Sequence, residues 1–285
     1  MSRTPARPRP APVDRGIPVE LRSLLLLGAV TAAVSLGAVA AFVGPWSPHA
    51  LHRPAGLVAA GAPAAARDAW LALADHRLAG ASNRAAALWR AAQVTAVELN
   101  DPAAADALAL RLIGEHPESA DVPEALALRG VLAQRLGRPA DAVTHLVAAA
   151  DALGDGPRAG ALLLSAAQLD PAQSGLSPAE REALLQRAAG EPTAAARAWI
   201  ELGNLSLEAS PAAAYEAYAR ALKAAGAADG AESDAARTAR LGMATALERL
   251  EGREAALAAV DEGLAEDADD EAMKRRKKRL DKRRR

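Results

Sequence analysis

Apolar and small residues recur at helical spacing along most of this 285-residue chain. In residues 127–150, two glycines precede a stripe of small and apolar side chains: Gly130, Gly137, Ala142, Leu146 and Ala149. Side chains three or four residues apart lie on one face of a helix, so the last three predict a single stripe. Gly137 suits the left-handed end of one helix, and Pro139 suits the first turn of the next. The pattern therefore predicts a helix–turn–helix hairpin.

The same pattern of a leading helix, a turn and a small-residue stripe recurs elsewhere. Its further members are Asp101-Pro102 with Ala105, Ala109 and Leu112, then Ser210-Pro211 with Ala214, Tyr218 and Ala221, and then Gly242 with Ala256, Val260 and Gly263. The stripes repeat about every 38 residues if the longest gap holds two units. The missing hairpin falls in residues 157–190, where Ser177 and Glu180 form a capping-box signature. The chain therefore reads as an array of helical hairpins.

Composition favours the same fold class. Aromatic residues make up only 2% of the chain, and no run of β-branched residues predicts a strand. A core of Ala, Leu and Val suits closely packed helices, and Ala and Leu are strong helix formers. We expect an all-α fold in which a helical-hairpin solenoid follows an N-terminal transmembrane helix. An unrelated α-helical bundle is the alternative for the hairpins.

Two stretches resemble the tetratricopeptide repeat (TPR), whose pattern is W-x2-L-G-x2-Y, then A-x3-F, then P. They are WIELG at 199–203 with AYEAYARAL at 214–222, and LRGVLAQRLGRPADAVTHLVAAA at 128–150. The resemblance covers about residues 86–268, and a degenerate hairpin at 64–82 surrounds Trp70. The chain departs from the family in its weak Trp and Tyr positions and its variable unit length.

The resemblance implies an extended concave face that binds a peptide or helix of a partner protein. In the family geometry the groove-facing, partner-binding residues would include Arg90, Glu98, Gln134, Arg135, Asn204 and Glu208. Asn204 matches the asparagine by which some family members grip a peptide's C-terminal carboxylate. Ile200 stands where those members carry a basic residue, so we do not expect a full carboxylate clamp.

The N-terminal segment SLLLLGAVTAAVSLGAVAAFV, residues 23–43, carries no charge over its 21 positions. A helix of this length spans about 30 Å, the hydrocarbon thickness of a bilayer. We expect a retained transmembrane helix. A signal peptide cleaved after the AVA at 38–40 and a buried helix are the alternatives. A stripe of small residues could let two such helices pair into a homodimer: Ala29, Ala33, Gly37 and Ala41.

Flanking charges predict the orientation of this segment. Five arginines precede it, whereas Arg53 and two histidines follow it closely. The positive-inside rule then keeps the N-terminus in the cytoplasm and exports the rest. We expect the following domains: a basic N-terminus at 1–22, the transmembrane helix at 23–43, a Pro- and Gly-rich linker at 44–63, the TPR-like repeats at 64–268 and a charged tail at 269–285.

Charge is distributed unevenly although the net charge is only −1. The N-terminal 22 residues carry +3 and residues 274–285 carry +9, which leaves −13 for the chain between them. The bases of the tail are Lys274, Arg275, Arg276, Lys277, Lys278, Arg279, Lys282, Arg283, Arg284 and Arg285. We regard this tail as too uniformly charged to fold alone. It could bind nucleic acid, anionic lipid or the acidic body of its own or a neighbouring chain, or nothing specific, and nucleic acid is the least expected partner in an exported array.

Catalytic chemistry has no sequence signature here. The chain lacks a phosphate-binding Gly-Lys-Ser/Thr loop, a His-Glu-x-x-His motif and a nucleophile elbow. It has no cysteine, which excludes disulfides and Cys-based metal sites. The two neighbouring histidines, His49 and His52, lie in the linker beside Arg53 and do not suit a metal. We therefore expect no enzyme activity, no cofactor and no metal.

Together these features predict a scaffold anchored in a bacterial inner membrane, with its repeats in the periplasm. The layout looks like that of ancillary subunits of the bacterial Sec translocon, which implies partners among exported proteins or an envelope complex. One alternative is a cytoplasm-facing adaptor whose basic tail binds anionic lipid or nucleic acid. Another is a soluble periplasmic binding module released by signal cleavage.

Overall fold

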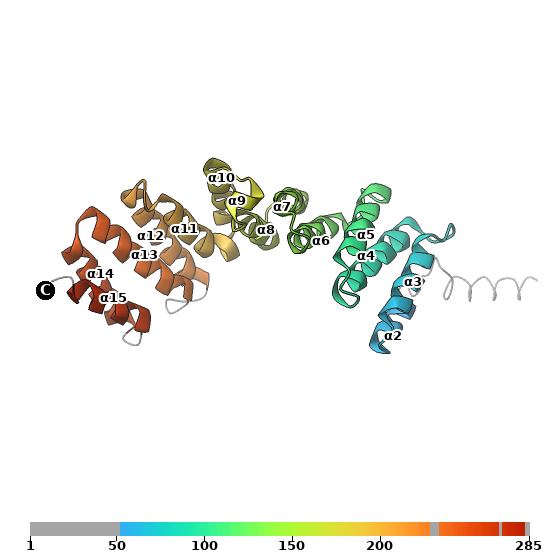
Figure 1. Ribbon diagram of the computed structural model, residues 1–285, viewed down its shortest axis with the longest axis horizontal. Coiled ribbons are helices and arrows are strands. Elements are labelled where there is room, and N and C mark those ends of the chain that lie inside the picture. The colour runs from blue at the N-terminus through green and yellow to red at the C-terminus, as the bar shows by residue number, and fades with distance from the viewer. Residues whose placement is uncertain (1–51, 229–233, 268–269, 283–285) are drawn as a thin grey trace, which may run out of the picture.

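The computed structural model describes residues 52–228, 234–267 and 270–282. Every regular element within these ranges is an α-helix. Two helices begin the array, α2 (His52–Ala59) and α3 (Pro63–Ala74). Five hairpins follow, and one last helix, α15 (Glu271–Lys282), closes the described part of the chain. In Figure 1 the helices form an extended array that runs from α2 at one end to α15 at the other.

Each hairpin consists of two antiparallel helices that differ in their position in the array. We call the first helix of each hairpin an inner helix: α4 (Ala81–Val97), α6 (Val122–Arg135), α8 (Pro157–Ala167), α11 (Pro192–Ser206) and α13 (Asp234–Leu250). We call the second helix an outer helix: α5 (Pro102–Glu115), α7 (Pro139–Leu153), α10 (Pro178–Ala189), α12 (Pro211–Ala228) and α14 (Arg253–Glu266). A short helix, α9 (Pro171–Ser174), lies between α8 and α10.

Several helix boundaries confirm the sequence predictions. Asp101 accepts a hydrogen bond from the backbone N–H of Ala104 at 3.0 Å and so caps α5. Ser177 and Glu180 form both hydrogen bonds of the capping box that begins α10. Gly137 adopts a φ of +70°, which glycine tolerates because it lacks a Cβ, and Pro139 opens α7.

Small side chains let the helices of each hairpin approach closely. The alanines that lead the predicted stripes, Ala105, Ala142, Ala214 and Ala256, are all fully buried. At Gly130 a Cβ atom would lie 2.7 Å from Leu146 Cγ, so α6 and α7 could not pack as they do with a larger residue there. The predicted stripes are therefore the hairpin interfaces, and the prediction of an all-α hairpin array is confirmed.

Contacts between neighbouring hairpins give the array its curvature. Inner helix α11 packs against the inner helices α8 and α13 on either side of it. Among the described residues, no two successive outer helices pack to the same extent. Inner helices α8, α11 and α13 therefore lie closer together than the outer helices beside them, and we take the inner-helix side as the concave side of the array.

Both ends of the described chain differ from the sequence interpretation. Helix α2 lies inside the range predicted as a linker, 44–63, and Pro54 fits there because it stands in the first helical turn. Helix α15 lies inside the predicted tail, where Met273 and Leu280 stand seven residues apart and are buried together. Packing of this apolar face overrides the repulsion between the bases.

The predicted membrane segment is outside the part of the chain that the structure describes. Residues 23–43, with the small-residue stripe at Ala29, Ala33, Gly37 and Ala41, precede the first described helix. None of the helices in the described ranges combines the length and the apolar character that crossing a bilayer requires.

Candidate partner-binding surfaces

The six predicted partner-binding residues all lie at the surface of inner helices or directly beyond their ends. Arg90 and Glu98 belong to α4 and its C-cap, Gln134 and Arg135 end α6, and Asn204 and Glu208 lie on and just after α11. All six side chains are exposed. The structure therefore places them on or beside inner helices, and it gives four of the six hydrogen bonds within the chain.

Arg135 links its own helix to the preceding inner helix. Its Nη1 donates to the backbone carbonyl of Ala96 at 3.2 Å, and its Nη2 donates to the side-chain oxygen of Asn100. The last carbonyls of a helix have no intrahelical partner and carry partial negative charge, so a guanidinium suits them. Arg135 thus holds the C-terminal end of α4 against α6.

Glu208 takes part in a second link of the same kind. Arg249 of α13 donates through Nη2 to Glu208 Oε1 at 2.7 Å and through Nη1 to the carbonyl of Leu207 at 3.2 Å. The hydrogen bond from Arg249 lowers the pKa of Glu208 below its usual value. Two inner-helix arginines, Arg135 and Arg249, therefore each bind the C-terminal end of the preceding inner helix.

Further polar contacts extend this arrangement along the whole concave side. We call them the polar ladder, and its remaining rungs are Glu124 with Arg158, Gln168 with Glu201, and Glu248 with Arg276. The ladder joins α4 to α6, α6 to α8, α8 to α11, α11 to α13 and α13 to α15. Exposed pairs of this kind are individually weak, whereas the Glu248–Arg276 pair is largely shielded, with side chains 20% and 17% exposed.

Asn204 also contacts its own chain. The hydroxyl of Tyr218 on α12 donates to Asn204 Oδ1 at 2.8 Å. Burial raises the pKa of Tyr218, and its side chain is only 2% exposed. Ile200, which departs from the family's basic position, is buried below the surface. Asn204 therefore orients Tyr218, and a contact of its amide with a peptide carboxylate stays a prediction.

Between α4 and α6, three of the predicted residues bond no neighbouring helix. Among the described residues, Glu98 and Gln134 make no side-chain hydrogen bond or ion pair, and Arg90 bonds only Gln93 of its own helix. Val97 and Val131 stand beside them and are 74% and 48% exposed. We call Val97, Glu98, Val131 and Gln134 the α4–α6 patch. The patch lies on both sides of the hydrogen bond from Arg135 to the carbonyl of Ala96. Val97 directly follows Ala96, and Val131 precedes Arg135 by one helical turn.

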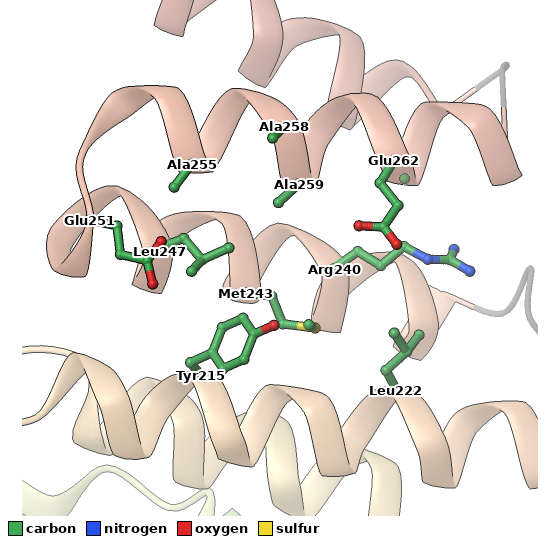
Figure 2. Close-up of a pocket in the computed structure, with 11 residues that line it drawn as sticks. Tyr215, Leu222, Arg240, Met243, Leu247, Glu251, Ala255, Ala258, Ala259 and Glu262 are labelled. Carbon is green, nitrogen blue, oxygen red and sulfur yellow. The ribbon is translucent and has the colours of Figure 1, made fainter.

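A pocket of about 410 Å³ lies on the other side of the array, between the outer helices α12 and α14. Figure 2 shows α13 behind it, with Tyr215 and Glu251 toward one end and Arg240, Leu222 and Glu262 toward the other. The small side chains of α14 that line it are Ala255, Ala258, Ala259 and Gly263. None of the six predicted residues lines this pocket, the pocket beside Asp270 or the pocket beside Asp151.

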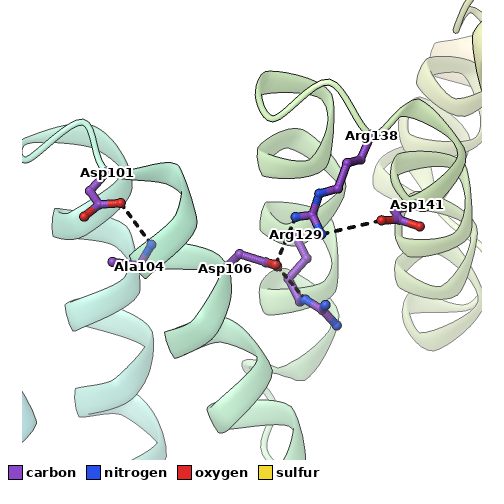
Figure 3. A network of polar contacts seen from close by, with 6 residues as sticks. All are labelled: Asp101, Ala104, Asp106, Arg129, Arg138 and Asp141. Carbon is purple, nitrogen blue, oxygen red and sulfur yellow. Dashed lines mark hydrogen bonds and ion pairs between the residues drawn. The ribbon is translucent and has the colours of Figure 1, made fainter.

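An ion-pair network ties α5 to the next hairpin (Figure 3). Asp106 binds Arg129 at 2.7 Å and Arg138 at 3.2 Å, and Arg138 also approaches Asp141 at 3.5 Å. Burial alone would raise the pKa of Asp106, but the hydrogen bonds and charges of the two arginines outweigh burial and lower it. No nucleophilic side chain belongs to this network, so we assign it a structural role.

Residues 52–228, 234–267 and 270–282 contain no group of three or more His, Asp or Glu side chains that could hold a metal ion. His116 and His145 lie partly buried on or beside different helices, and burial lowers the pKa of both.

Comparison with known proteins finds likeness only in the fold. No family model and no curated protein matches the chain. The chain is similar to BtubC (BKLC) from P. vanneervenii, with 14% identity, coverage of 74% of this chain and 89% of that one, and a TM-score of 0.50. It is also similar to the TPR domain of P58(IPK), with 20% identity, coverage of 81% of this chain and 63% of that one, and a TM-score of 0.32. The likeness to BtubC is one of fold alone, and the stacked hairpins themselves form a helical repeat array.

Proposed function

We propose that this protein is a non-enzymatic scaffold that binds a segment of a partner protein along its concave side. The observation that carries the proposal is the α4–α6 patch, where two large apolar side chains, Val97 and Val131, are exposed on adjacent inner helices. Exposed apolar side chains gathered beside polar ones are typical of protein-binding surfaces.

The patch can also satisfy the polar groups of a bound segment. The carboxylate of Glu98 can accept a hydrogen bond from a partner N–H, and the amide of Gln134 can both donate and accept. These groups are available because the polar ladder passes through Arg135 and leaves them out. An extended peptide or one face of a helix would fit such a strip.

Site-specific photocrosslinking of the full chain in cells tests this proposal. We expect a benzoylphenylalanine at position 131 or 134 to give the same crosslinked partner, and one at the exposed outer-helix position Lys223 to give none. Val97→Asp should reduce the crosslink at 134 about tenfold, because it places a charge in the apolar part of the contact. Equal crosslinking at position 223, or no effect of Val97→Asp, would contradict a concave binding site.

We further propose that residues 23–43 anchor the chain in a bacterial inner membrane, with the N-terminus in the cytoplasm and the array in the periplasm. The support is the uncharged 21-residue segment and the excess of arginine before it. Partners would then be exported proteins or an envelope complex. The small residues on one face of the segment would allow two anchors to pair.

Topology is tested by labelling introduced cysteines, since the chain has none of its own. We expect Ser47→Cys and Ala272→Cys to react with a membrane-impermeant maleimide in cells with a permeabilised outer membrane, and Ser2→Cys to react only after lysis. The opposite pattern would place the array in the cytoplasm. An N-terminus that mass spectrometry finds processed near residue 40 would replace the anchor with a cleaved signal.

A further inference from the structure

We propose that the outward face of α15 binds the anionic headgroups of a phospholipid membrane. We call this face the basic stripe, and it consists of Arg275, Lys278, Arg279 and Lys282. The proposal is independent of the concave binding site, because α15 stands at the opposite end of the array from the α4–α6 patch (Figure 1).

Apolar packing fixes α15 on the array. Met273 is fully buried and Leu280 is 1% exposed, and both pack in one cluster with Ala256 and Val260 of α14. Gly263 makes room for this packing, since a Cβ there would lie 2.5 Å from Met273 Cε. The helix therefore has one settled orientation.

Two of its cations reinforce that orientation by pairing with the array. Arg276 binds Glu248 of α13, and Lys277 Nζ lies 2.7 Å from Asp261 Oδ1 of α14. Lys274 pairs with Glu271 at the start of the same helix. Lys274, Arg276 and Lys277 are therefore each paired with a carboxylate of the described chain.

The basic stripe consists of the other bases of α15 within the described residues. Its residues stand at i, i+3, i+4 and i+7, so they form one row about 10 Å long on one helix face. All four side chains are exposed, and none forms an ion pair with another described residue. Like charges on adjacent turns of a helix repel each other and destabilise it. A helix that only closes the end of a repeat array needs a polar outer face, and uncharged polar residues would provide one without this repulsion.

The chemistry of this face favours a lipid surface over other anionic partners. Helix α15 contains no aromatic side chain on which a nucleic-acid base could stack. Its outward face has no large apolar side chain to anchor a protein interface, and its apolar face is already buried in the array. A membrane surface needs neither, because each Lys or Arg near anionic lipid strengthens the attraction about fivefold by charge alone. The apolar segment at 23–43 would bring the chain to such a surface.

Energy transfer in reconstituted vesicles tests the stripe in the full chain. Ala272→Cys, an exposed position on α15, carries the donor dye, and a headgroup-labelled lipid carries the acceptor. We expect transfer to rise at least about twofold when phosphatidylglycerol is added to phosphatidylcholine vesicles, and to fall back at high salt. Reversal of the stripe with R275E, K278E, R279E and K282E should remove the rise.

A matched control separates the stripe from net charge. Arg53, Arg77, Arg197 and Lys223 are exposed on other helices and loops, and their replacement by Glu changes the net charge by the same amount. This control should keep the rise, and circular dichroism should show that both variants remain helical. Three results would overturn the proposal: no rise in wild type, an equal loss in the control, or displacement of the wild-type chain from phosphatidylglycerol by equimolar duplex DNA.

Discussion

Replacing Gly203 or Gly242 with alanine is expected to destabilise the C-terminal hairpins, although alanine is the better helix former. A Cβ at Gly203 would lie 2.6 Å from Tyr218 Cε1, and a Cβ at Gly242 would lie 2.5 Å from the same atom. The ring of Tyr218 therefore fits between the backbones of α11 and α13. It cannot retreat, because it is buried and its hydroxyl is bonded to Asn204.

The overpacking should outweigh the gain in helix propensity. Inserting a methyl group into a close-packed contact costs about 1–3 kcal/mol, and here two neighbouring backbones restrain the ring. Exchanging glycine for alanine inside a helix contributes up to about 1 kcal/mol in the other direction. Hydrogen exchange of α11, α12 and α13 is the suitable measurement, because a repeat array can lose hairpins locally.

Gly226→Ala is the matched control for these two variants. Gly226 lies in the same hairpin, and a Cβ there would have nothing within 4 Å. This variant should leave exchange unchanged or slow it. Combining Gly203→Ala with Tyr218→Leu should be less destabilising than the sum of the single changes, because the smaller side chain relieves the contact. Strict additivity would show that the ring is not the obstacle.

Local rules made the hairpins predictable from the sequence. Asp101, Gly137 and Ser177 act on residues a few positions away, so their capping roles can be read directly from the chain. The stripe that includes Tyr218 follows from helical spacing alone. What spacing cannot show is that Gly242, in the next hairpin, makes room for the same ring.

The roles of the predicted binding residues depend on contacts between hairpins. Arg135 reaches a carbonyl 39 residues earlier and Arg249 one 42 residues earlier, distances over which sequence patterns carry little information. Family geometry predicted Arg135 and Glu208 as partner-binding residues, and the structure shows both in polar contacts between successive inner helices. In the sequence, only the small residues of α14 could have indicated the pocket beside Tyr215. The pocket arises from the separation of the two outer helices α12 and α14, which the sequence pattern does not show.

Helix α15 shows how a highly charged segment becomes part of a core. Residues 271–282 carry a run of bases, yet the two apolar residues of the run fall on one face. From its charge we predicted that this segment would not fold alone. In the structure it is helical while packed against α13 and α14. Its fold therefore depends on packing against the last hairpin of the array.

Met273→Ala combined with Leu280→Ala should therefore release α15 and loosen α13 and α14. Each truncation of a fully buried large side chain costs about 2–5 kcal/mol, and the exposed surface of Val260 and Ala256 adds to the loss. We expect protease cleavage within residues 270–282 and faster hydrogen exchange in both helices of the last hairpin. Lys278→Ala with Lys282→Ala, two exposed positions on the same helix, should change neither.

The ion pairs of α15 provide the comparison that decides which force holds it. Arg276→Ala removes the contact with Glu248, and Lys277→Ala removes the one with Asp261. The Lys277–Asp261 pair lies at the surface, where water and salt screen it, whereas the Arg276 and Glu248 side chains are only 17% and 20% exposed. We expect the loss of either pair to speed exchange less than the loss of the two apolar side chains, because the latter change removes more buried apolar surface. If the Arg276 and Lys277 variants release the helix as completely as the Met273 and Leu280 variant does, charge rather than apolar burial attaches α15, and high salt should then detach it from the wild-type array.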